Sequence, residues 1–267
     1  MDFSILIPVF VGLASAVLVN YLADVLPEQR KLSMPACPQC GATFYGRDYL
    51  LLRRCASCGK PRATRAWTAL AALAGLNVYL WFSAPSNLGY GLSALIVAYF
   101  AVIFIIDLER RLILHVTSYF GMALMALIGW KLRGWSATLL GGATGFGFML
   151  ALYYLGVYFA RYRARKMQQA GQAADDEEAL GFGDVMLGGV LGLLLGGRLV
   201  WGGLLQGILL AGAFGVLLVI FMLVVRKYKE NALMIFMPYG PFLIVSAFLM
   251  VFLPRWTLGA LIALAQR

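Results

Sequence analysis

The chain has 267 residues, of which 62% are hydrophobic and only 13% are charged, and its formal net charge is +10. Soluble domains have about 25% charged residues, so this composition excludes a soluble globular protein and predicts an all-α polytopic membrane protein. Basic residues gather in the cytoplasmic loops of such proteins, which explains the positive charge without nucleic acid as a partner. The expected surroundings are the lipid bilayer.

The first apolar segment, residues 3–26, predicts a transmembrane span. It is longer than the apolar part of a secretory signal, and Asp2 precedes it where a signal would have basic residues. We therefore expect a retained first span, 1–26.

Residues 27–66 form a basic insert that contains all four cysteines, in the pattern C-x2-C-x14-C-x2-C. The cysteines are Cys37, Cys40, Cys55 and Cys58. Two close pairs, each followed by a glycine that permits a tight turn, favour four thiolates around a structural zinc ion in a zinc-ribbon-like fold. The alternatives are two disulfides or four inert thiols, and a cytoplasmic position disfavours the former.

The rest of the chain, 67–267, predicts a seven-span membrane core, for a total of about eight transmembrane helices. The expected spans after the first are 67–84, 88–107, 112–130, 136–160, 182–197, 199–225 and 233–253. Residues 161–181 between two of them form a charged loop that we expect to be mobile.

The charge distribution orients these spans. With the N-terminus outside, the segments on the inner side hold 17 of the 22 basic residues. The positive-inside rule therefore places the cysteine insert (27–66) and the loop 161–181 in the cytoplasm.

Two carboxylates lie where predicted spans meet the cytoplasm. Asp107 closes the third span and Asp184 opens the sixth, so the same side of the membrane holds both. Ionisable groups at membrane depth are costly and tend to mark function, and two neighbouring carboxylates share a proton. One carboxylate and one carboxylic acid together can activate water and protonate a leaving amine.

Each acid also has a structural interpretation. Asp107 could pair with Arg110 or Arg111 at a helix end, and Asp184 could cap a helix. The two arginines could steer an acidic substrate residue, although anchoring of the span is favoured. The single histidine, His115, fits an interfacial helix residue better than an acid–base catalyst.

Gly181 and Gly183 precede Asp184 in the stretch G-F-G-D. Glycines there permit positive φ and the close approach of an extended peptide substrate. A packing role is the alternative.

Together these motifs resemble the type IV prepilin peptidases, a family of bacterial membrane aspartic proteases with a G-x-G-D block. The resemblance is carried by the four-cysteine insert, by "IDLERRLI" around Asp107, by "GFGDVMLGGVLGLLLG" and by "MPYGPFLIVSAFL". It implies that Asp107 and Asp184 are the catalytic pair of an inner-membrane enzyme.

The resemblance also implies the substrates. Family members remove the leader of type IV prepilin or pseudopilin precursors on the cytoplasmic side, which serves type IV pilus assembly and protein secretion. Many also methylate the new N-terminus with S-adenosylmethionine, so the resemblance implies that cofactor for a second, N-methyltransferase activity.

Two other functions remain open at the level of sequence. A related membrane aspartic protease could process flagellin-like precursors, and a zinc-stapled, proton-coupled transporter could use the two aspartates as a relay. A transporter would be expected to place them near the bilayer midplane rather than at its inner edge.

Overall fold

The computed structural model describes residues 3–169, 181–224, 238–254 and 257. The chain divides into two compact units, Met1–Leu112 and Ile113–Arg267. Within the described ranges the regular elements are helices, with one isolated β-bridge between Ala36 and Thr43 and no strand. The predicted all-α membrane class is confirmed.

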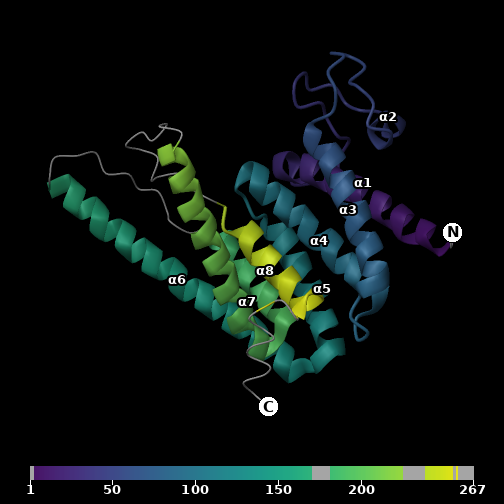
Figure 1. The fold of residues 1–267 in the computed structure, drawn as a ribbon. Coiled ribbons are helices and arrows are strands. Elements are labelled where there is room, and N and C mark those ends of the chain that lie inside the picture. The colour runs from purple at the N-terminus through teal and green to yellow at the C-terminus, as the bar shows by residue number, and fades with distance from the viewer. Residues whose placement is uncertain (1–2, 170–180, 225–237, 255–256, 258–267) are drawn as a thin grey trace. The chain divides into compact units, whose positions relative to one another are not determined.

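The first unit is a small helical bundle that carries the cysteine insert. Its elements are η1 (Phe3–Ile5), α1 (Leu6–Gln29), α2 (Gly46–Leu50), α3 (Thr64–Ser83) and α4 (Gly89–Arg110). Helix α1 packs against both α3 and α4, and the insert with α2 extends beyond the end of α1 and the start of α3 (Figure 1). The buried amide of Asn20 donates to the carbonyl oxygen of Ala66 at 3.3 Å and ties α1 to α3.

The second unit is built around one long helix. Its elements are α5 (His115–Arg133), α6 (Trp135–Gln169), α7 (Phe182–Val224) and α8 (Gly240–Phe252). Helix α7 packs against the other three, with α6 and α8 running beside it (Figure 1). The hydroxyl of Ser246 in α8 donates to the carbonyl oxygen of Gly203 at 2.6 Å.

Glycines bring α6 and α7 into backbone contact. A Cβ built on Gly192 would lie 2.7 Å from the carbonyl carbon of Gly141, and one built on Gly141 would lie 2.6 Å from Gly196 Cα. Lipid tails are as apolar as a leucine side chain, so helices in a membrane gain little by hiding apolar surface and rely on close packing instead. Small residues at this crossing allow that packing.

Within the described part of the chain, five helices are long and apolar enough to cross a membrane, namely α1, α3, α4, α6 and α7. At 43 residues, α7 would be about 64 Å long if straight, more than twice the roughly 30 Å of a bilayer core. It is broken at Gly196, where φ is 77° and ψ is 168°. The gap expected between the spans 182–197 and 199–225 thus falls next to this break.

The guanidinium of Arg133 supports the break. Arg133 donates to the carbonyl oxygen of Leu194, in the turn just before the interruption at Gly196. A cation at a helix C-terminus also interacts favourably with the helix dipole.

Helix α6 continues past its predicted end at residue 160 as far as Gln169. The stretch after residue 160 contains Arg, Ala, Lys, Met and Gln, which have high helix propensity, so the helix persists although the sequence becomes polar. The expected loop 161–181 is therefore helical in its first part, and 170–180 lie outside the described residues. The start of the expected span 233–253 lies outside them as well.

The glycine crossing predicts a position-dependent effect of adding one methyl group to α7. Gly192→Ala should lower the melting temperature in detergent, because overpacking costs about 1–3 kcal/mol. Gly212→Ala is the matched control, since its Cβ would meet nothing within 4 Å. Equal melting temperatures for the two variants would contradict the crossing.

Candidate functional site

The four cysteines lie on two loops of the same shape, which we call knuckles. In the first, the Cys37 N–H donates to Ala42 O at 2.8 Å and the Gly41 N–H donates to Cys37 O at 2.9 Å. The second repeats both hydrogen bonds, from Cys55 to Lys60 at 3.0 Å and from Gly59 to Cys55 at 2.8 Å. Gly41 and Gly59 have φ of 71° and 68°, the left-handed conformation expected of glycine in these turns.

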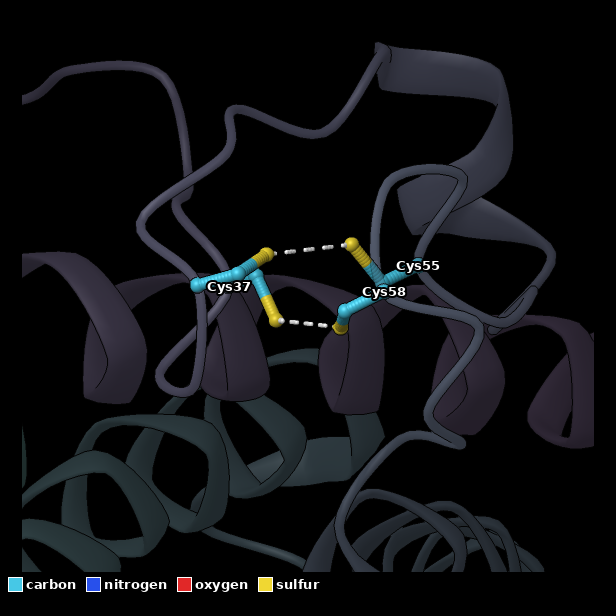
Figure 2. A group of neighbouring side chains, drawn as sticks. Cys37, Cys55 and Cys58 are labelled. Carbon is cyan, nitrogen blue, oxygen red and sulfur yellow. Dashed lines mark hydrogen bonds between the residues drawn. The ribbon is translucent and has the colours of Figure 1, made fainter.

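The knuckles face each other and bring the four sulfur atoms together. Cys37 Sγ lies 3.8 Å from Cys58 Sγ, and Cys40 Sγ lies 3.6 Å from Cys55 Sγ. The labelled cysteines 37, 55 and 58 turn their sulfurs toward one another across the two loops (Figure 2). All four sulfurs lie within 4.8 Å of one another.

These distances fit a metal centre rather than disulfides. A disulfide joins sulfurs at about 2.05 Å, and all four cysteines are free. A tetrahedral site with Zn–S bonds of about 2.3 Å has sulfurs about 3.8 Å apart along its edges. The four cysteines could therefore hold a zinc ion without large rearrangement.

The knuckle backbone favours the thiolate form of one cysteine in each pair. Backbone hydrogen bonds from Cys58 and Ser57 lower the pKa of Cys55 to about 6, and a backbone hydrogen bond from Gln39 lowers that of Cys37. The pKa of Cys40 rises to about 12, since burial and the neighbouring thiols outweigh the hydrogen bond from Ala42. Four thiolates repel one another, so a bound cation is what would allow all of them to ionise.

An aromatic cluster fixes the cysteine insert on α1. Cys37, Phe44, Tyr49 and Cys55 are buried together, and Tyr21 of α1 packs against them. The Arg62 guanidinium lies over the Tyr49 ring, 4.2 Å from its centroid, and 4.9 Å from that of Phe44. Such cation–π contacts and ring packing hold the insert in one orientation.

Asp24, near the end of α1, joins three elements. Its carboxylate accepts from the Tyr49 hydroxyl at 2.5 Å, from Arg62 at 2.9 Å and from Arg65 of α3. Burial, followed by the bond to Asp24, raises the pKa of Tyr49, so its hydroxyl stays a donor. Nothing local in the sequence around Asp24 indicates these partners.

Arg65 extends the cluster to α4, where it donates to Glu109 Oε2 at 2.7 Å. Nearby, Arg110 donates to Glu28 Oε1 at 2.9 Å. These bonds place the end of α4 beside the end of α1 and the start of α3. They also give Arg110 a partner other than Asp107.

Asp107 lies in the last turn of α4 and is 4% exposed. Among the residues that the structure describes, it is the one charged residue in the buried set. Arg111 ends the helix with φ of 51°, and its N–H donates to the Asp107 carbonyl oxygen at 2.8 Å. Within the first unit, Asp107 thus lies at the same end of the bundle as the cysteine insert.

Asp184 lies in the first turn of α7 and is half-buried. Its N–H donates to the Gly181 carbonyl oxygen at 3.1 Å. Asp107 belongs to the first unit and Asp184 to the second, so their meeting stays a prediction.

The two glycines before Asp184 differ. A Cβ on Gly183 would lie 2.7 Å from Ile113 Cβ, whereas the nearest atoms of described residues to a Cβ on Gly181 are Asp184 Oδ2, at 3.7 Å, and the Gly183 nitrogen, at 4.0 Å. Gly183 does not have a positive φ. Packing against Ile113 is therefore a sufficient reason for a glycine at position 183.

His115 begins α5 and is exposed.

The apolar helices and the cysteine cluster indicate a polytopic membrane protein with a four-thiol site that could hold a metal ion. Residues 94–224 match the model of the type IV leader peptidase family. This match supports a protease of the leader peptidase family, and the matched segment includes both Asp107 and Asp184. No curated protein and no solved structure matches the chain significantly.

Replacing one cysteine should release the metal that we predict for this cluster. Purified wild-type protein should contain about one zinc per chain by elemental analysis, and Cys55→Ser should contain far less, because a hydroxyl is a poor zinc ligand at neutral pH. Ser57→Ala, within the same knuckle, is the control and should keep its zinc. If wild-type protein expressed and purified in zinc-containing medium contained no bound zinc, the predicted site would be wrong.

The packing of Gly183 predicts different effects at the two glycines. Gly183→Ala should lower the melting temperature, because its methyl group would overlap Ile113. Gly181→Ala should leave the melting temperature within a few degrees of wild type. A thermal-shift comparison in detergent tests both, and a stable Gly183→Ala would contradict the contact.

Proposed function

We propose that the chain is an aspartic endopeptidase that removes the leader of type IV prepilin or pseudopilin precursors, with Asp107 and Asp184 as its catalytic pair. The observation that carries the proposal is the burial of Asp107 at the end of α4, inside the segment that matches the leader peptidase family. Asp184, half-buried at the start of α7, supplies the second carboxylate in that segment.

The chemistry needs the two aspartates in different protonation states. The ionised one takes a proton from water, and the water oxygen attacks the scissile carbonyl carbon. The protonated one gives its proton to the amide nitrogen as the C–N bond breaks. The products are a carboxylic acid and a free N-terminal amine, and no covalent enzyme intermediate forms.

The charge distribution supports cleavage on the cytoplasmic side of a bacterial inner membrane. The inner segments hold 17 of the 22 basic residues, and the Asp24 cluster holds the insert beside the end of α4. The apolar segment of a precursor would lie among the spans while its polar leader stays in the cytoplasm. Its scissile peptide would pass Gly181, where a Cβ would come no nearer than 3.7 Å to any described residue.

Zinc in the four-cysteine cluster has a structural role in this proposal. Cys37, Cys40, Cys55 and Cys58 would fill all four positions of a tetrahedral ion and leave none for water. When bound, the ion would supply rigidity to the knuckles.

A second activity is proposed on the family resemblance alone. S-adenosylmethionine, when bound, would supply the methyl group for the new N-terminal amine and would leave as S-adenosylhomocysteine once its S–CH3 bond is broken and the amine has lost a proton. No residue of this chain is assigned to that step.

The aspartate pair makes the proposal testable. Asp107→Asn and Asp184→Asn should each reduce cleavage of a purified prepilin by about 10³-fold or more, because an amide cannot carry the proton. The control is Asp48→Asn, which removes an acid of the cysteine insert that is distant in sequence from both aspartates. This variant should cleave at the wild-type rate. Both catalytic variants should express and retain zinc.

The readout is the mass of the product after incubation with and without S-adenosylmethionine. Loss of the leader reports cleavage, and a further gain of one methyl group reports methylation. Cleavage at the wild-type rate by either asparagine variant contradicts the mechanism. Cleavage of flagellin-like precursors in preference to prepilins would redirect the substrate assignment, and Asp107-dependent ion flux without cleavage would favour a transporter.

A further inference from the structure

We propose that Arg65 is a positioning residue, which fixes the rotation of α4 about its axis and thereby the direction of the Asp107 carboxylate. The inference rests on the proposed function, in which Asp107 takes part in the reaction. It concerns a residue that the leader peptidase match, 94–224, does not cover.

The first step is the double contact of Arg65. Its guanidinium donates to Asp24 of α1 through one nitrogen and to Glu109 of α4 through the other. A planar guanidinium holds two carboxylates in a defined geometry, which a lysine ammonium cannot do. Arg65 thus links the end of α1 to the end of α4.

The second step is the burial of the arginine in this bridge. The Arg65 side chain is 16% exposed and that of Asp24 is 21% exposed, whereas Glu109, at 38%, lies at the surface. By contrast, both members of the Arg110–Glu28 pair are about half exposed. Exposed ion pairs contribute little, whereas shielded pairs with further hydrogen bonds hold their geometry.

The third step is the charge balance of the cluster. Arg62 and Arg65 face Asp24 and Glu109, so two positive charges meet two negative ones. The Tyr49 hydroxyl of the cysteine insert adds a neutral donor to Asp24. Removing the Glu109 charge would leave Arg65 with one carboxylate and free α4 from the cluster.

The fourth step is helix geometry. Residues two apart on an α-helix lie about 200° apart around its axis, so Asp107 and Glu109 point in nearly opposite directions. Holding Glu109 on Arg65 therefore sets where Asp107 points without any contact between the two. Small errors in the placement of a catalytic group cost large factors in rate.

Glu109→Gln tests the inference because it removes the charge of the α4 partner and leaves Asp24, Tyr49 and all four cysteines in place. We expect kcat for cleavage of a purified prepilin to fall about tenfold. The KM, the zinc content and the melting temperature should stay near wild type. Arg65→Lys should also lower kcat, because one ammonium cannot hold both carboxylates.

The matched control is Glu28→Gln, which removes an ion pair between the same two helix ends. Its kcat should stay within about twofold of wild type, since that pair is exposed. An unchanged kcat in Glu109→Gln overturns the inference. The inference is also overturned if the zinc content or the melting temperature falls together with kcat, because the role of Glu109 would then be merely structural.

Asp107→Asn, measured in the same assay, separates this inference from the proposed function. If Asp107→Asn is inactive and Glu109→Gln cleaves normally, only the positioning role fails. If Asp107→Asn cleaves normally, the proposed catalytic pair itself is wrong.

Discussion

The carboxylate of Asp24 is the contact on which the first unit depends. Near the end of a helix that crosses the membrane, a charged group is tolerated only if donors surround it. Asp24 receives three, from the cysteine insert, from the segment that leaves the insert and from α3. The Asp24 side chain thereby holds both the insert and the start of α3 against the end of α1.

The second unit is held together differently. Its α6–α7 contact consists of glycine backbones close enough to exclude any side chain, and its α7–α8 contact includes a hydroxyl bonded to a glycine carbonyl. Both solutions suit lipid, where packing and hydrogen bonds replace the hydrophobic effect between helices. The glycines after Asp184 therefore place the helix that presents this acid.

Sequence predicted the features that depend on local chemistry. Apolar runs predicted the helices, and the spacing of cysteines and glycines predicted two knuckles with tight turns, in which Gly41 and Gly59 have positive φ. The break in α7 was also expected near its place. These features follow from a few neighbouring residues.

Features that depend on distant partners were missed. Arg65 and Glu109 lie 44 positions apart, and neither the cation nor the acid is unusual in its own surroundings. The packing of Gly183 on Ile113 depends on a residue just before another helix, so the pattern of glycines could offer packing only as an alternative. The end of α6 was missed for a different reason. Hydropathy indicates where a helix leaves the lipid, and the helix can continue beyond that point.

The structure separates two kinds of acid within one helical turn of α4. Glu109 shares the Arg65 guanidinium with Asp24 and so anchors the end of α4 to α1 and α3. Asp107, two residues earlier, is buried and points to nearly the opposite side of the helix. One face of this short segment thus carries the anchoring carboxylate, and the other face carries the carboxylate that we propose for catalysis.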